Sequence, residues 1–153
     1  MSYFNNAPPA ITTMSYKSFT FTGGALFGAV GNCALFTTTG GVHVVSMDAV
    51  CSTTVTVDGG TGTASIKLGV VGSLSLFIGV MSAVLLTSTN KHWQSTTPTA
   101  GGIAQAAAQQ DIDISGNIVM EVTSTGTQVV NGGTVEFRVV WFPITAGASL
   151  VAA

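Results

Sequence analysis

Residues 130–143, which read VNGGTVEFRVVWFP, decide the fold class of this chain. From Val135 to Trp141 every second residue is apolar, and Glu136 and Arg138 stand between them. Successive side chains of a strand point to opposite faces, so this period of two predicts a half-buried β-strand. The same alternation recurs in residues 18–22, 54–57, 63–68 and 118–123. The sequence therefore predicts an all-β protein, and its 153 residues fit one domain.

Glycine-containing turns separate the predicted strands. They fall at residues 39–41, 58–60, 115–117 and 131–133, where Gly, Asn and Asp tolerate a positive φ. We expect residues 58–62 and residues 131–133 each to close a β-hairpin. Eight or nine short strands rich in Thr and Val predict a single antiparallel β-sandwich of jelly-roll type.

Three parts of the chain follow from this pattern. We expect an extended N-terminal arm at residues 1–16, a β-sandwich domain at 17–144 and a C-terminal tail at 145–153. Two consecutive prolines favour an extended path for the arm. The longest insertion between strands is residues 90–110, and loops of that length are often functional. Its Ala- and Gln-rich stretch, residues 103–110, could form two helical turns.

The composition is poor in charge. Charged residues make up 7% of the chain, against roughly a quarter in an ordinary soluble domain. Four cations in a chain of net charge −2 cannot neutralise a row of phosphates, so we expect no nucleic-acid partner. With so few charges, apolar side chains must also reach the surface. We expect neighbouring subunits to cover much of that surface.

The sequence indicates neither a membrane span nor a secretory signal. Residues 68–90 carry no charge, and their length approaches that of a membrane-spanning helix. Gly and Ser interrupt them, however, and residues 73–76 alternate, so we expect strands there and no membrane partner. The first 17 residues lack the cationic and apolar regions of a secretory signal, so we expect the mature chain to begin near Met1.

Conventional acid–base catalysis would depend on the two histidines, His43 and His92. His43 alternates within residues 42–45 and is expected to be structural, on a strand. His92 lies in the long insertion, where an exposed or interface side chain is expected. The chain contains none of the common catalytic, nucleotide-binding or zinc-protease motifs. We therefore predict no enzyme activity, no catalytic residue and no cofactor; a metal-dependent hydrolase that uses either histidine is the competing hypothesis.

Residues 111–116, DIDISG, match the first half of a calcium-binding loop, with oxygen ligands at positions one, three and five and glycine at six. The match ends there, because position twelve is Val122. A short strand with Asp111 and Asp113 facing solvent is the preferred interpretation, so we predict no metal site. Cys33 and Cys51 lack metal-type spacing and are expected to be buried free thiols; a bridge between them is the alternative.

Residues 19–31, FTFTGGALFGAVG, and residues 34–40, ALFTTTG, resemble small virion proteins of tailed bacteriophages, and residues 130–143 are similar too. The likeness is a loose pattern of glycines and aromatics over residues 17–144, from which the insertion at 90–110 departs. It implies a head-associated capsid decoration or cement protein, which would sit on the exterior of the shell as a homotrimer. The implied partners are other copies of the chain and the major capsid protein, with assembly in the host cytoplasm.

Two other structural functions remain open. One is a phage tail, spike or receptor-binding β-module that recognises a host surface, with Trp93 as the best exposed aromatic. The other is a bacterial surface or fibre subunit. The aromatic arm and the long insertion supply the candidate assembly contacts, which are Tyr3, Phe4, Pro8, Pro9, Tyr16, His92 and Trp93.

Overall fold

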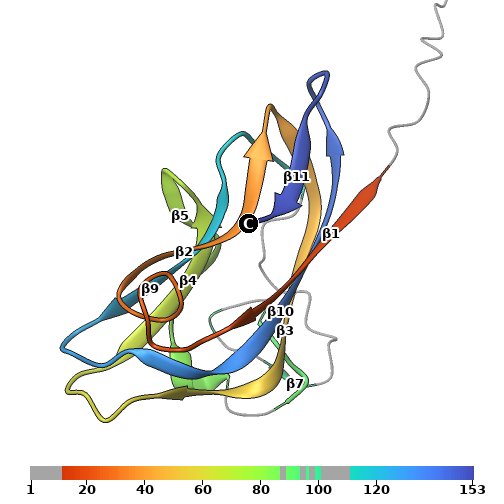
Figure 1. The fold of residues 1–153 in the computed structure, drawn as a ribbon. Coiled ribbons are helices and arrows are strands. Elements are labelled where there is room, and N and C mark those ends of the chain that lie inside the picture. Colours follow the sequence, from red (N-terminus) through yellow and green to blue (C-terminus); the bar gives the residue numbers. More distant parts are fainter. Residues whose placement is uncertain (1–11, 87–88, 94–95, 97–98, 101–110) are drawn as a thin grey trace, which may run out of the picture.

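A computed structural model of the chain describes residues 12–86, 89–93, 96, 99–100 and 111–153. Nearly all of its regular structure is β-strand, and one short 3-10 helix, η1 (Ala83–Leu85), occurs within the described residues (Figure 1). The strands are β1 (Thr13–Thr20), β2 (Gly31–Thr39), β3 (Val42–Val57), β4 (Ala64–Val70), β5 (Ser73–Ser82), β6 (Lys91–His92), β7 (Thr99–Ala100), β8 (Ile112–Ile114), β9 (Ile118–Ser124), β10 (Val130–Pro143) and β11 (Ser149–Ala152).

The strands form two antiparallel sheets that pack face to face (Figure 1). In the first sheet the order is β1-β10-β3. The other edge of β3 pairs with β8 near the start of β3 and with β6 further along, and β6 in turn pairs with β7. In the second sheet the order is β11-β2-β9-β4-β5. The chain changes sheet at seven of the ten connections between consecutive strands, so neighbours in sequence are rarely paired with each other.

The pairing is nested. The innermost pair is β4 with β5, and around it lie β3 with β8, β2 with β9 and β1 with β10. A chain folded back on itself in this way and rolled into two sheets of four strands is a jelly roll. β11 extends the second sheet beyond β2. The prediction of an antiparallel β-sandwich of jelly-roll type is confirmed.

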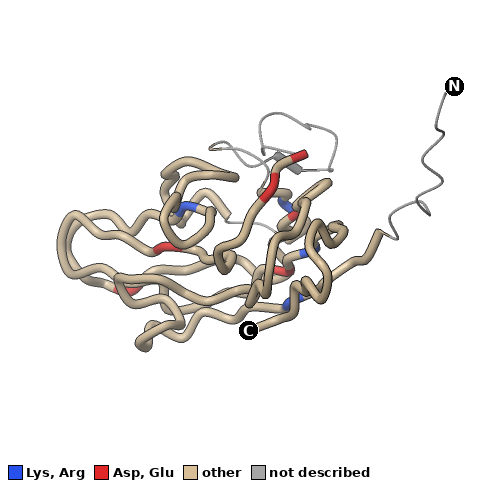
Figure 2. Tube along the Cα trace, turned by 90° about the horizontal axis from the view of Figure 1, so that it is seen from above, with Lys and Arg blue, Asp and Glu red and all other residues tan. Residues whose placement is uncertain are grey.

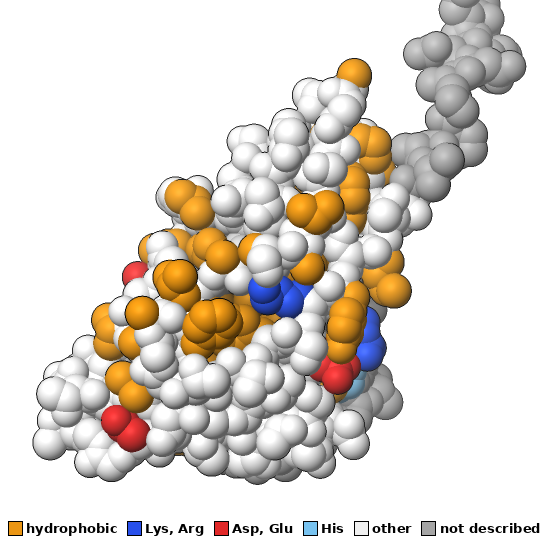
Figure 3. Space-filling model, viewed as in Figure 1, with side chains coloured by type: hydrophobic (Ala, Val, Ile, Leu, Met, Phe, Trp, Pro, Cys, Tyr) orange, Lys and Arg blue, Asp and Glu red, His pale blue; other side chains and the backbone are white. Residues whose placement is uncertain are grey.

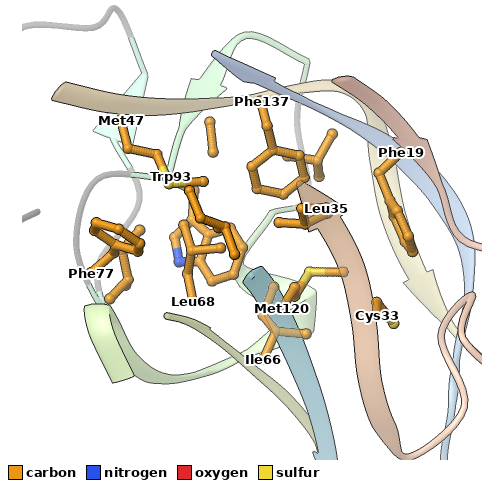
Figure 4. Packing of buried hydrophobic residues seen from close by; sticks show 14 of the residues in the cluster. Phe19, Cys33, Leu35, Met47, Ile66, Leu68, Phe77, Trp93, Met120 and Phe137 are labelled. Carbon is orange, nitrogen blue, oxygen red and sulfur yellow. The ribbon is translucent and has the colours of Figure 1, made fainter. Parts of the chain in front are cut away.

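The core lies between the sheets and is formed by the alternate residues that the sequence pattern selected. Phe137 of β10 is fully buried, and its ring meets that of Trp93 edge to face at a centroid distance of 6.3 Å. Figure 4 shows side chains of both sheets converging on this pair, among them Leu35, Leu68 and Met120. Each fully buried side chain of this size contributes about 1.5–3 kcal/mol of transfer free energy.

Both predicted hairpins are wrong. Residues 58–62 connect β3 of the first sheet to β4 of the second, and residues 131–133 lie inside β10, where its register against β3 shifts in a bulge. At Gly133 φ is +101°, and a Cβ would lie 2.5 Å from the Cα of Val55. Glycine clusters indicate positive φ or close backbone approach, and a bulge or a crossing loop needs these as much as a hairpin does.

The sandwich extends beyond the boundaries predicted at 17 and 144. β1 begins at Thr13, inside the predicted arm, and pairs with β10 from that residue onward. The alternation was hidden because the inward position here is occupied by a serine, Ser15. The predicted tail contains β11, whose four residues are too few to show a period. The described part of the chain contains no helix that is long and apolar enough to cross a membrane.

Ser15 links the two sheets at the β1 edge. It is 9% exposed, and its hydroxyl donates a hydrogen bond of 2.5 Å to the carbonyl of Leu150 on β11. The indole nitrogen of Trp141 on β10 donates to the same hydroxyl at 2.9 Å. One side chain therefore satisfies a donor and an acceptor that are both buried, and it joins three strands.

We predict that Ser15→Ala lowers the free energy of unfolding by about 1–3 kcal/mol, because the Trp141 N–H and the Leu150 carbonyl lose their shared partner. Urea denaturation measures the change. Ser18→Ala is the matched control, since Ser18 is exposed on the same strand. Equal stability of the two variants would show that the hydroxyl contributes nothing to the junction.

Candidate functional site

The predicted assembly contacts divide into three groups. Tyr3, Phe4, Pro8 and Pro9 lie outside the described residues. Tyr16 and His92 lie on the outer face of the first sheet: Tyr16 is exposed on β1, and His92 is partly buried on β6. Trp93 forms the third group, because its side chain lies in the core.

Trp93 is buried, with 1% of its surface exposed, so its prediction as an exposed aromatic contact is wrong. Its backbone N–H continues the ladder by donating to the carbonyl of Ala49 at 2.7 Å. Because side chains alternate along a strand, His92 points outward with Val50, its partner in the ladder, and Trp93 points into the core with Ala49. Which of His92 and Trp93 reaches solvent depends on how the short strand β6 is aligned with β3. The sequence of two residues does not reveal that alignment.

A row of three side chains crosses the outer face of the first sheet. His43 of β3 pairs across the ladder with Asp113 of β8 on one side and with Phe142 of β10 on the other. The imidazole Nδ1 lies 2.5 Å from Asp113 Oδ1, and the ring stacks on Phe142 at a centroid distance of 4.5 Å. The imidazole Nε2 lies 3.6 Å from a carboxylate oxygen of Asp111.

The two carboxylates raise the pKa of His43 above its usual value. The largest cause is the hydrogen bond with Asp113, and Asp111 acts in the same direction, while desolvation opposes both. The protonated imidazole is therefore favoured in the folded protein. In that form both ring nitrogens carry a proton that faces an acidic oxygen.

A second histidine–aspartate pair lies further along β3. His92 Nδ1 on β6 is 3.0 Å from Asp48 Oδ1 on β3. β6 lies at the start of the long insertion and β8 follows its end in sequence, so each end of the insertion is joined to β3 by one such pair. We call the two pairs, His43–Asp113 and His92–Asp48, the histidine clasps. Both pairs fasten a short strand, β6 or β8, to the edge of β3, where the strand itself forms few ladder hydrogen bonds.

The charged side chains are distributed unequally between the two outer faces. The first sheet carries the histidine clasps together with an ion pair in which Arg138 Nη2 lies 3.4 Å from Glu136 Oε2. On the outer face of the second sheet, Lys67 of β4 forms an ion pair with its ladder partner, Glu121 of β9. Figure 2 shows how long the uncharged stretches of the trace are between such positions. The second sheet therefore presents a nearly neutral face.

The geometry of His43 fits strand fastening better than catalysis. An imidazole oriented by a carboxylate is one half of a hydrolase triad, and the other half is a nucleophile beside the second ring nitrogen. Here the second nitrogen faces Asp111, another carboxylate. In the part of the chain that the structure describes, no group of three or more His, Cys, Asp or Glu side chains is arranged to hold a metal ion.

Residues 112–114 form a strand, as the sequence suggested, with Ile114 buried and Asp113 exposed. Sequence reasoning placed His43 and Asp113 correctly on strands but missed that they meet. Their separation of 70 residues is bridged only by the register of β8 on β3. The sequence shows a histidine and an aspartate in the middle of two predicted strands. It does not show that these two strands pair with each other.

Comparison with known proteins adds no family to this description. No protein-family model matches the chain, and no significant match was found among curated proteins or solved structures. Functional inference depends on the residues of the chain itself.

We predict that the His43 clasp makes stability depend on pH. Because the folded pKa lies above the unfolded value of about 6.5, the stabilisation is complete below that pH and is lost as pH rises through the folded pKa. Asp113→Asn should lower the pKa of His43 and flatten the fall in unfolding free energy as pH rises above about 6.5. NMR titration of His43 combined with urea denaturation tests both effects, and His92→Gln identifies the signals. An unchanged slope in Asp113→Asn would contradict the clasp.

The thiols provide a further prediction. Cys33 and Cys51 are free and buried, and burial raises the pKa of each thiol. We expect neither to react with an alkylating reagent near neutral pH in the folded protein, since the thiolate is the reactive form. Both should react in denaturant without a reductant, and mass spectrometry counts the adducts. Labelling of the folded protein at the rate of the unfolded chain would show that the core opens readily.

Proposed function

We propose that this chain is a non-enzymatic structural protein of a virion, and specifically a capsid decoration or cement protein of a tailed bacteriophage. In this role it binds the major capsid protein on the outside of the shell, associates as a homotrimer and stabilises the particle. The main support for the proposal is that many large apolar side chains are exposed on a domain that has very few charged residues.

Exposed apolar side chains occur on strands and loops at both ends of the sandwich. Monomeric soluble proteins rarely leave extended apolar surface uncovered, and such surface marks sites of association. Among the described residues, the exposed large apolar side chains are Met14, Tyr16, Leu26, Phe27, Val30, Val71, Val80, Val84, Leu85, Ile144 and Val151.

The jelly roll supports the same proposal by analogy. This fold is common in viral capsid domains, but it also occurs in lectins and in enzymes, so it raises the expectation without assigning a function. The sequence resemblance to phage virion proteins in residues 19–31 and 34–40 points in the same direction.

The segment before β1 is the natural means of attachment. Residues 1–11 carry no charge and include Tyr3 and Phe4. They lead directly into the outer face of β1, where Met14 and Tyr16 are exposed. Burying aromatic rings against a neighbour contributes about 1.5–3 kcal/mol for each fully buried ring. The arm is therefore residues 1–11, since a longer deletion would remove part of β1.

The alternative, a spike or receptor-binding module, was based on an exposed Trp93. Because Trp93 belongs to the core, that observation no longer favours it. Copy number separates the two functions, since a decoration protein occurs in hundreds of copies per particle and a spike in a handful.

We predict that the full chain associates, with a trimer expected at tens of micromolar in sedimentation, because a closed ring buries the exposed apolar surface. A chain that begins at Thr12 should keep the circular dichroism and melting temperature of the full chain but associate more weakly. A full chain that sediments as a monomer would contradict the proposal. Loss of folding on truncation would show that the arm belongs to the sandwich.

A further inference from the structure

The connection between β1 and β2 is an apolar loop at one end of the sandwich. We call residues 22–30 the apolar loop. Three of its large apolar side chains are exposed: Leu26 by 63%, Phe27 by 50% and Val30 by 59%. In Figure 3, apolar side chains gather over this loop and over the adjoining edge of the sandwich between β1 and β2. The loop contains no charged residue.

The loop is held in one conformation by its own backbone. Thr22 and Gly23 both donate to the carbonyl of Phe27, at 2.8 and 3.1 Å, and the carbonyl of Gly28 accepts from Val130 of β10 at 3.0 Å. A Cβ on Gly28 would lie 1.9 Å from the carbonyl oxygen of Val130, so only glycine permits this approach. The ring of Phe27 stacks on Phe19 at a centroid distance of 5.9 Å.

Leu26 is the most unusual residue of the loop. Its φ is +65°, a left-handed conformation in which a Cβ is unfavourable. Asparagine or glycine would occupy that position at lower cost, and either would avoid exposing an apolar side chain. A strained backbone that displays leucine to solvent, in a loop fixed by hydrogen bonds, is a preorganised contact.

The neutral character of the loop restricts what can cover it. Attraction to an anionic membrane or to nucleic acid requires cations. Lys17, on the preceding strand, donates instead to the oxygen of Ala153. A partner without charged side chains fits best, and residues 1–11 of the chain are such a segment, with Tyr3, Phe4 and Ile11 as apolar side chains.

The position of this segment permits contact between copies. The segment joins the sandwich at Thr13, and the apolar loop follows Thr20 at the opposite end of β1. Residues 1–12 can reach about 40 Å when extended. A contact from the start of β1 in one copy to the end of β1 in the next is head to tail, and a contact of that kind gives a ring when the rotation between copies closes and an open filament when it does not.

We propose that the apolar loop of each copy receives the N-terminal arm, residues 1–11, of a neighbouring copy, with Leu26 as the central contact. This inference rests on the proposed function, in which the arm is the means of attachment, and it adds the surface that receives the arm. The bound class is a neutral aromatic-containing peptide segment of the same chain.

Leu26→Asn tests the contact without weakening the fold, because asparagine tolerates the left-handed conformation. We expect it to preserve or raise the melting temperature while weakening association about tenfold or more. Val71→Ser is the matched control: Val71 is also an exposed apolar residue but lies in the turn between β4 and β5, and its loss should weaken association much less than Leu26→Asn does.

Combining Leu26→Asn with deletion of residues 1–11 separates the possible outcomes. If the arm and the loop touch, the double variant should associate no more weakly than the deletion alone. If the deletion weakens association and Leu26→Asn does not, the arm attaches elsewhere and only the inference about the loop is overturned. If the two effects add, the loop has another partner and the inference is also overturned. If the full chain is monomeric, the proposed function itself fails.

Crosslinking identifies the contact directly. We expect a mixture of Tyr3→Cys and Leu26→Cys chains to form a disulfide-linked dimer on oxidation, and a mixture of Tyr3→Cys and Val71→Cys chains to form none. In a Tyr3→Cys/Leu26→Cys double variant, a crosslink confined to the monomer would show that the arm folds onto its own loop. Sedimentation of the wild-type protein with vesicles of neutral phosphatidylcholine would show that the loop binds lipid. Either result overturns the proposal.

Discussion

The pairing of β3 with β10 is the interaction on which the rest of the structure depends. These are the two longest strands, of 16 and 14 residues, and they pair from Val42 with Pro143 to Val57 with Val130. Every other strand of the first sheet attaches to one of them, directly or through β6. Their inner faces carry Val44 and Met47 on β3 and Val135, Phe137 and Val139 on β10, so the same pairing aligns most of the first sheet's contribution to the core. The bulge at Gly132 and Gly133 lets two long strands keep this register while the sheet twists.

Strand positions were predictable because a half-buried strand records its orientation in every second residue. The connections were not, because a glycine-rich turn has the same sequence whether it closes a hairpin or crosses to the opposite sheet. Inward polar residues mislead in the same way: Ser15 concealed the start of β1, although its hydrogen bonds make it suited to burial. At the candidate site, the sequence correctly predicted a strand at Asp113 but wrongly predicted an exposed Trp93. The side chain of Trp93 points inward because of the register of β6, and a shift of one residue would turn it outward. The meeting of His43 with Asp113 depends on register between distant segments, which no local pattern encodes.

The two outer faces of the sandwich differ in a way that composition alone conceals. Acidic side chains and both histidines collect on the first sheet, where they fasten the strands that flank the long insertion. The second sheet keeps a single ion pair, Lys67 with Glu121, within the described residues. A chain with ten charged side chains uses several of them in internal partnerships, so few remain to keep the surface hydrated. The proposed association would cover such a surface.

The continuity of the N-terminal segment with β1 has a mechanical consequence. A pull on the residues before Thr13 acts along the axis of β1, at right angles to the hydrogen bonds that join it to β10 over eight paired residues. Tension in that direction loads all of these bonds at once, as in shear, whereas a pull across the strand would break them one after another. Ser15 adds resistance near the loaded end, because its hydroxyl is tied to both β10 and β11. The β1 edge can therefore carry a sustained load from one end of the sandwich without peeling from the sheet.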